Sequence, residues 1–199
     1  MAKDKIQPHY PPYTAIVTGH EAQFDAASQE PSVSVACVGE VPQRNDSINI
    51  LMSGFYHSSC TPAQNDFSLP SDTDAIVRAS SSTFIFSKGT NLRLTEFPPH
   101  GEAPMHRTST LDYNIITHGS ITLVTPSFPS DSDGKPKLTE THAKVGDVVV
   151  QRGTLHAWRA GPQGCKFYTV VVDAVPVEAP ASASGIKSHV LEPCVPYED

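Results

Sequence analysis

Two stretches of the chain carry side chains that can transfer protons or bind a metal ion. The first, residues 105–119, places His106, Thr108 and Asp112 at even spacing. Residues at even spacing on extended backbone point to one face, so these three side chains could share one interior. The second stretch, residues 146–158, adds His156 and Trp158. We therefore predict one small-molecule site in which the two histidines face each other.

Two chemistries are open to this set of residues. His106, Asp112 and His156 are two imidazoles and one carboxylate, the facial triad of non-haem Fe(II) sites, and the same donors could hold Zn²⁺. In a metal-free site the histidines would act as general acid and base, and Asp112 would orient one of them or stabilise its charged form. The cofactor prediction is therefore either none or one divalent metal, Fe or Zn.

Three other residues are candidates for contact with a substrate. Thr108 would offer a hydroxyl group. Trp158 lies two residues after His156, so on extended backbone both side chains point to the same face. Trp158 therefore either stacks on an aromatic substrate or packs in the core. Arg93 has the parity of Thr95, so it either reaches inward to an anionic group or lies on a solvated face. The alternative for His106 and His156 is that they are hydrogen-bonded core residues with no role in a functional site.

Further polar residues near the two stretches are not expected to act in the site. His118 shares the parity of Asp112, but six residues of strand span about 20 Å, which puts His118 at the far end of a barrel. Arg107 and Tyr113 have the opposite parity, which favours sheet packing or an interface.

The composition excludes several classes of protein. The 199 residues suggest one domain, and a formal net charge of −7 does not favour nucleic-acid binding. No apolar run is long enough to span a membrane, and residues 1–8 do not resemble a secretory signal, so we expect a cytoplasmic protein. The four cysteines form no CxxC pair and are expected to be reduced thiols: Cys37, Cys60, Cys165 and Cys194.

Strand patterns separated by Gly and Pro recur along the chain, and no long stretch has the period of a helix. Strands are expected at 14–18, 32–38, 48–56, 83–86, 91–97, 112–118, 121–125, 138–145, 148–150, 154–159 and 167–172. Loops are expected at 20–32, 58–74 and 126–137, and the long second loop could cover the site. The prediction is an antiparallel β-sandwich or barrel with three parts: an arm at 1–13, the barrel domain at 14–174 and a proline-rich tail at 175–199.

The first stretch resembles a motif of the cupin superfamily, commonly G-x5-H-x-H-x3,4-E-x6-G. Gly101, His106 and Gly119 match it, with one residue fewer after Gly101. Thr108 stands at the second histidine position and Asp112 at the glutamate position.

The second stretch resembles the other cupin motif, commonly G-x5-P-x-G-x2-H-x3-N. Gly146 and His156 match it, whereas Arg152-Gly153 replaces Pro-x-Gly and Ala160 replaces the asparagine. Together with Ile16-Val-Thr-Gly-His20, these departures are similar to single-domain cupins found beside fungal secondary-metabolite genes.

The resemblance implies a cupin-type antiparallel β-barrel or jelly roll with an N-terminal strand extension, and a homodimer formed by exchange of N-terminal strands. It implies a tailoring enzyme that acts on a polyketide-like or aromatic intermediate as a dehydratase, decarboxylase or isomerase. The alternatives are an Fe(II) oxygenase that uses His106, Asp112 and His156, and a ligand-binding cupin without catalysis. The expected partners are a small-molecule substrate and a second copy of the chain, with no nucleic acid and no membrane.

Overall fold

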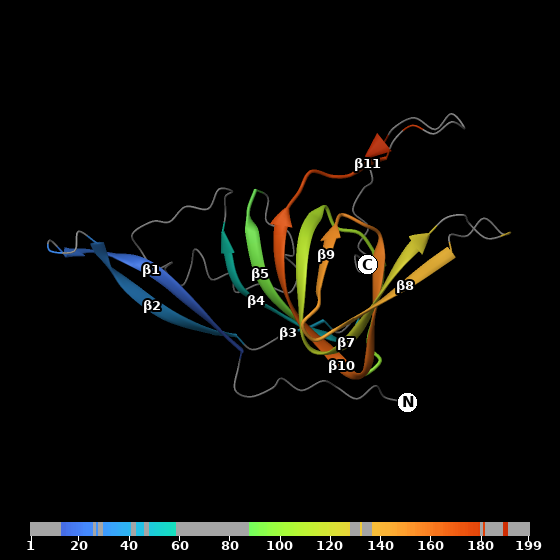
Figure 1. Cartoon of the computed structure of the whole chain (residues 1–199), viewed down its shortest axis with the longest axis horizontal. Helices are drawn as coiled ribbons and strands as arrows, with labels where there is room; N and C mark the ends of the chain where they lie inside the picture. The colour runs from blue at the N-terminus through green and yellow to red at the C-terminus, as the bar shows by residue number, and fades with distance from the viewer. Residues whose placement is uncertain are drawn as a thin grey trace.

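The chain is all-β in the computed structural model, as the sequence predicts (Figure 1). The structure describes residues 13–25, 27, 30–40, 43–45, 48–58, 88–127, 132, 137–179, 181 and 189–190. None of these residues forms a helix long and apolar enough to cross a membrane.

Eight strands form one antiparallel sheet in the order β3–β4–β5–β10–β7–β8, with β6 beside β10 and β9 beside β7. Their bounds are β3 Gln43–Asn45, β4 Ile50–Ser58, β5 Thr90–Phe97, β6 Glu102–His106, β7 Thr110–Ser127, β8 Lys137–Lys144, β9 Val148–Arg152 and β10 His156–Asp173. Two further pairs stand outside this sheet: β1 Tyr13–Asp25 with β2 Glu30–Glu40, and β11 Glu178–Ala179 with β12 His189–Val190.

The two longest strands, β7 and β10, each contain a sharp bend. The sequence pattern predicts two separate strands in place of each, at 112–118 and 121–125 and at 154–159 and 167–172, and this prediction is wrong. Gly119 and Gly164, both at positive φ, meet at the bend, where a Cβ on Gly119 would lie 2.0 Å from the carbonyl oxygen of Gly164. The register between the strands shifts here, between Ala160 and Cys165. The glycines therefore bend two continuous strands together instead of ending them.

The bends fold the sheet over on itself and enclose the core. Trp158 and Phe167 lie nine residues apart on β10, about 30 Å along a straight strand, yet their ring centroids are 5.8 Å apart. One half of β10 pairs with β6 and the other half with β5, so the two halves belong to opposite layers. The apolar core lies between these layers and consists of Ile50, Phe97, Ala103, Ile116, Ile121, Ala143, Trp158, Ala160, Cys165 and Phe167.

Most of the other expected strands are confirmed. Those at 14–18, 32–38, 48–56, 91–97, 138–145 and 148–150 correspond to β1, β2, β4, β5, β8 and β9. The loop expected at 20–32 is wrong over most of its length, because β1 continues to Asp25 and β2 begins at Glu30.

Several expectations fall largely outside the described residues. The strand at 83–86 lies entirely outside them, and of the loop at 58–74 only Ser58, the last residue of β4, is described. The loop at 126–137 is shorter than expected, because β7 extends to Ser127 and β8 begins at Lys137. The arm at 1–13 and the tail at 175–199 are described only in part.

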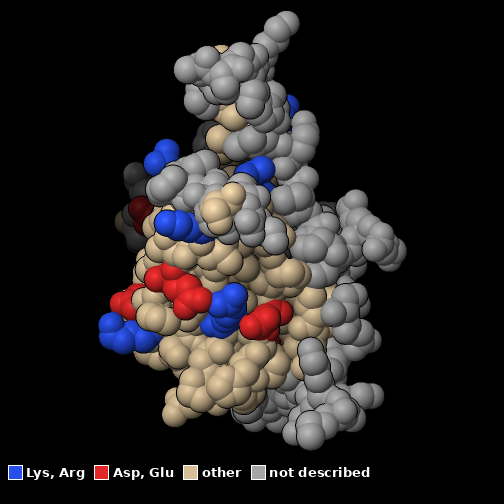
Figure 2. Space-filling view, turned by 90° about the vertical axis from the view of Figure 1, so that its right-hand side faces the viewer, with Lys and Arg blue, Asp and Glu red and all other residues tan. Residues whose placement is uncertain are grey.

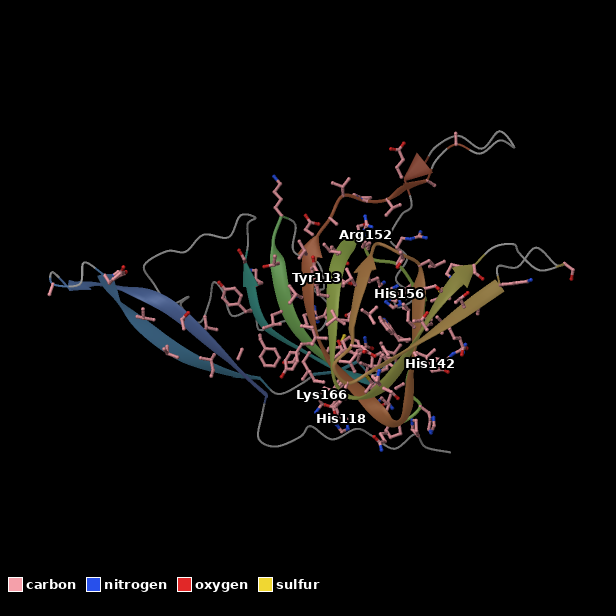
Figure 3. All side chains as sticks on the ribbon, in the orientation of Figure 1. Tyr113, His118, His142, Arg152, His156 and Lys166 are labelled. Atoms are coloured by element: carbon pink, nitrogen blue, oxygen red, sulfur yellow. The ribbon has the colours of Figure 1, made fainter. Side chains whose placement is uncertain are left out.

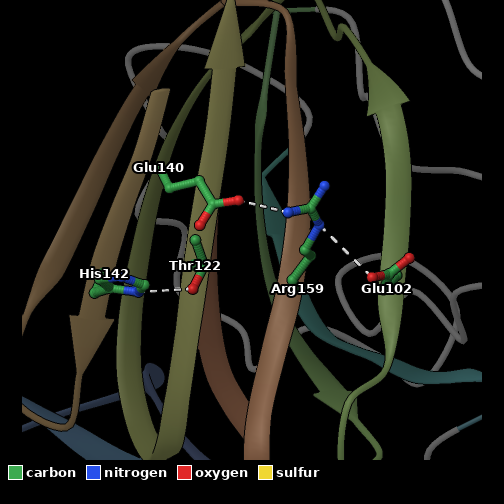
Figure 4. A network of polar contacts seen from close by, with 5 residues as sticks. All are labelled: Glu102, Thr122, Glu140, His142 and Arg159. Carbon is green, nitrogen blue, oxygen red and sulfur yellow. Dashed lines mark hydrogen bonds and ion pairs between the residues drawn. The ribbon is translucent and has the colours of Figure 1, made fainter. Parts of the chain in front are cut away.

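The outer surface differs between the two layers. On the layer with β6 and β8, polar side chains face outward: Arg159 bonds Glu140 at 2.6 Å and lies 3.6 Å from Glu102, and Thr122 bonds His142 (Figure 4). On the face drawn in Figure 2, basic and acidic side chains lie next to each other instead of forming a patch of one sign.

Two other surfaces expose apolar side chains. The β1–β2 pair projects away from the barrel (Figure 1) and exposes Ile16, Val33 and Val35. The outer face of β7 and β9 exposes four more, paired across the strands: Tyr113 with Val150, and Ile115 with Val148. The outward position of Tyr113 agrees with its predicted parity.

Candidate functional site

His106 and His156 lie together, as the sequence predicts. His106 ends β6, His156 begins β10, and the two are direct partners in the β6–β10 register. Their ring centroids are 4.1 Å apart. Figure 3 shows His156 within the barrel, whereas His118, which is exposed, lies at its lower edge beside Lys166. The position of His118 agrees with its exclusion from the site.

Backbone carbonyl groups lie at Nδ1 of both imidazole rings. His106 Nδ1 lies 2.7 Å from the carbonyl oxygen of Pro104, and His156 Nδ1 lies 2.9 Å from that of Thr154. A carbonyl oxygen only accepts hydrogen bonds, so Nδ1 of His106 carries a proton and the neutral ring has its lone pair on Nε2. For His156 the Thr154 carbonyl favours the same tautomer, and the amide nitrogen of Gln151 contacts both ring nitrogens.

Burial lowers the pKa of both histidines. For His106, desolvation lowers the pKa from its usual 6.5, and the hydrogen bond to Pro104 opposes the shift. For His156, desolvation and then repulsion from His106 lower the pKa to about 3. Both rings are therefore neutral near pH 7. His156 is the more deeply buried of the two and hence the weaker base.

Gln151 also belongs to the site, although the sequence analysis did not select it. This buried residue of β9 places its amide nitrogen 2.9 Å from His156 Nε2 and also contacts His156 Nδ1. Donation from the amide to His156 Nε2 leaves His106 Nε2 as the ring nitrogen that can accept a proton from another molecule. The one sequence signal for Gln151 was a polar residue that follows the apolar run of β9 and precedes Gly153.

Asp112 lies beside Gln151 across β7 and β9, where the two residues are register partners. Burial raises the pKa of Asp112 from 3.8 to about 6, and a hydrogen bond with Thr110 opposes the shift. The hydroxyl groups of Thr110 and Thr108 lie 2.8 Å apart and form a hydrogen bond, and both threonines are buried. Thr108 is thus held by the protein, on the same side of the site as Asp112.

Trp158 is part of the apolar core. Its ring meets His156 edge-on at 5.5 Å and packs against Phe167. With 5% of its surface exposed, Trp158 packs between His156 and the apolar core.

Arg93 is fully buried, with 0% of its surface exposed. The alternative prediction, that Arg93 lies on a solvated face, is therefore wrong. The face of β5 that carries Arg93 and Thr95 points to the inside of the barrel. Desolvation lowers the pKa of Arg93 to about 10, so the guanidinium stays charged at neutral pH.

Two rows of side chains cross the inner face of β5, β10, β7 and β9 in register. The first polar row consists of Asn91, Val171, Asp112 and Gln151. The second polar row consists of Arg93, Thr169, Asn114 and Val149. The next residues inward along these strands are Thr95, Phe167 and Ile116, which lead into the apolar core. The barrel interior is therefore apolar at one end and polar beside the histidines.

The side chains present do not fit the three-donor metal centre. Across the described part of the chain, no three His, Cys, Asp or Glu side chains gather in a group that could hold a metal ion. Asp112 thus does not join the two imidazoles. In addition, the Gln151 amide lies at Nε2 of His156, the nitrogen a metal would need.

Cys165 is a free and buried thiol, which agrees with the prediction for this cysteine. Burial raises its pKa to about 12, so it is not a thiolate at neutral pH.

No family model matches the chain. Phomopsin biosynthesis cluster protein C' of Diaporthe leptostromiformis is 37% identical over 92 residues, which are 45% of this chain and 43% of that protein. The cupin-domain-containing oxidoreductase srdD of Neurospora crassa is 36% identical over 75 residues, 38% of this chain and 33% of that protein. The chain therefore spans less than half the length of these curated relatives. Among solved structures, the cupin domain of Cnp3 from Schizosaccharomyces pombe is 12% identical, with a TM-score of 0.43 and coverage of 83% of this chain and 86% of that one.

The chain is related to proteins of fungal secondary-metabolite gene clusters, and its relatives include a cupin-domain-containing oxidoreductase. The predicted all-β antiparallel fold is confirmed. The stretch that resembles the first cupin motif covers β6 and the first half of β7, and the stretch that resembles the second motif covers β9 and the start of β10. Because β6 pairs with β10 and β7 with β9, the two motifs meet at the histidine pair.

Proposed function

We propose that this protein is a small-molecule tailoring enzyme of secondary metabolism that works by proton transfer, as a dehydratase, decarboxylase or isomerase. The observation that carries the proposal is the pair of imidazole rings 4.1 Å apart, each with its Nδ1 at hydrogen-bond distance from a backbone carbonyl oxygen. The relationship to proteins of fungal biosynthetic clusters supports the substrate class.

His106 is the general base in this proposal. Its Nδ1–H is held by Pro104, so its Nε2 lone pair has a fixed direction. A pKa below 6.5 keeps the ring unprotonated at neutral pH, which a base requires. His156 stays neutral and, held by Gln151 and Thr154, keeps the ring of His106 in place.

Asp112 is the second proton-transfer group. A carboxyl group with a pKa of about 6 exists in both protonation states near neutral pH, which suits a general acid. In a dehydration, His106 takes the proton from carbon as the C–H bond breaks. Asp112 gives a proton to the departing hydroxyl group, so a double bond and one water molecule form. Proton exchange with solvent then restores both groups.

The test is turnover of β-hydroxycarbonyl and hydroxylated aromatic compounds in D2O, followed by NMR for deuterium at carbon and by mass spectrometry for loss of water or carbon dioxide. We expect His106→Gln to lower the rate by at least about 100-fold. The matched control is His142→Gln, because His142 is exposed on the outer face and hydrogen-bonds the side chain of Thr122. A His106→Gln variant with the rate of the wild type would contradict the proposal.

A second candidate function is an oxidoreductase, because the Neurospora relative is named a cupin-domain-containing oxidoreductase. In that case the same compounds would consume oxygen, and oxygen uptake measured with and without added Fe(II) separates it from the first candidate. A protein that binds such compounds and converts none of them would be a ligand-binding cupin.

A further inference from the structure

The first polar row holds polar atoms that the described part of the protein does not satisfy. Asn91 is 2% exposed, and neither its Oδ1 nor its Nδ2 has a hydrogen-bond partner there. Asp112 is 5% exposed, and its Oδ1 likewise has no hydrogen-bond partner among the described residues. Buried polar groups in native proteins are nearly always hydrogen-bonded, and leaving one unpaired destabilises the fold. The pattern is therefore expected where a ligand supplies the missing partners.

The second polar row provides an internal comparison. Thr169 donates a 2.8 Å hydrogen bond to Asn114 Oδ1, and Asn114 Nδ2 reaches the carbonyl oxygen of Val149 at 3.4 Å. Asn114 is as buried as Asn91, but its amide is satisfied within the sheet. The missing partners are thus a property of the first row and not of buried amides in this barrel generally.

The register sets the distance that a ligand would span. Asn91 and Asp112 are both partners of Val171, one on each side of β10. Neighbouring strands lie about 4.8 Å apart, so the two side chains stand on strands about 10 Å apart. A molecule with a backbone of three or four carbons, lying over Val171, could reach both side chains.

The positive charge of Arg93 indicates which class of ligand the site would bind. Arg93 lies two residues from Asn91 on the same face of β5 and is fully buried. A guanidinium group carries five N–H donors arranged to match a carboxylate, and burial strengthens that preference. On the other side of Val171, Asp112 offers an oxygen that can accept a hydrogen bond from a hydroxyl group.

We propose that the two polar rows bind a β-hydroxycarboxylic acid, with its carboxylate toward Arg93 and the amide of Asn91 and its hydroxyl group toward Asp112. The inference deepens the proposed function and takes its chemistry from it. A β-hydroxyl group beside a carboxylate is the arrangement that a dehydration consumes: the C–H bond breaks toward His106 and the C–O bond beside Asp112. Binding itself requires no turnover.

The test uses 3-hydroxybutanoate as the probe, with 3-hydroxybutanamide and butanoate as matched compounds, in isothermal titration calorimetry. We expect the hydroxy acid to bind at least about 30-fold more tightly than the amide, because a buried charge pair is lost. We expect it to bind about 5-fold more tightly than butanoate, because one hydrogen bond is lost. Equal affinity for the acid and the amide would overturn the proposal.

Two leucine substitutions make the test independent of the charge. Asn91→Leu should raise the melting temperature of the ligand-free protein, because it removes unsatisfied polar atoms, and should weaken binding of the hydroxy acid about 10-fold. Asn114→Leu is the control and should lower the melting temperature, because it breaks the bond from Thr169. A lower melting temperature for Asn91→Leu with unchanged acid binding would contradict the proposal.

Binding and turnover can fail separately. If the wild type and His106→Gln both bind the hydroxy acid and no compound is converted, the proposed catalysis fails and the ligand assignment stands. If only neutral compounds are converted and no acid binds, the catalysis stands and the ligand assignment fails.

Discussion

Replacement of Asp112 by asparagine tests the burial of this carboxyl group most clearly. In the folded protein its pKa is about 6, raised from 3.8 chiefly by burial. A raised pKa means that the folded state holds the proton more tightly than the unfolded state. The stability from this group is therefore complete below about pH 3.8 and is lost as the pH rises through about 6.

The size of the effect follows from the shift. The two pKa values differ by about 2 units, which corresponds to about 3 kcal/mol of unfolding free energy. Asp112→Asn has no proton to lose at this position. The stability of the variant minus that of the wild type should therefore rise by about 2.5 kcal/mol between pH 4 and pH 8, because a small part of the effect is already lost at pH 4. All other titrating groups are common to both proteins, so their contributions cancel.

The assay is urea unfolding at several pH values in the presence of a chelator, followed by the fluorescence of Trp158, the single tryptophan. Glu102→Gln serves as the control, because this carboxyl group has a side chain that is 66% exposed. A difference that stays constant with pH would refute the burial argument. A difference that falls as the pH rises would show that a cation stabilises the Asp112 carboxylate in the folded protein.

Three further predictions concern packing and assembly. Gly119→Ala should lower the unfolding free energy by at least about 2 kcal/mol in urea titrations, because it combines a positive φ with a clash against Gly164; wild-type stability would contradict the account of the bend. Trp158→Ala should cost about 3–5 kcal/mol, measured by circular dichroism, because it empties a buried core position; a cost below 1 kcal/mol would contradict the core assignment. We also propose that the chain forms a homodimer through the exposed apolar face of the β1–β2 pair. Light scattering should then give twice the mass of the chain. Val35→Asp should give a monomer, whereas the surface control Lys137→Asp should stay dimeric.

The parity of strand residues carried most of the correct sequence predictions. Because side chains alternate along a strand, His106 and His156 could be assigned to one interior before their pairing was known. The same rule placed Tyr113 on the outer face. For Arg93, parity fixed only which residues share its face, and whether that face is buried depends on how the sheet closes.

Features that depend on distance across the sheet could not be predicted from local patterns. A glycine that bends a strand and a glycine that ends one have the same sequence pattern, so β7 and β10 were each divided in two. Gln151 lies only five residues before His156, and the short turn at Gly153 between β9 and β10 brings the two side chains together, which the alternation of side chains along a strand does not predict. Even spacing also cannot show that Asp112 lies apart from the two imidazoles.

The most direct test of the central claim is the ¹⁵N NMR spectrum of the imidazole rings at pH 7, assigned with the His106→Gln and His156→Gln variants. The account predicts that both rings are neutral, with a proton on Nδ1 and none on Nε2, and that a chelator leaves their shifts unchanged. A proton on Nε2 in either ring, or shifts that move when the chelator is added, would contradict a metal-free acid–base pair.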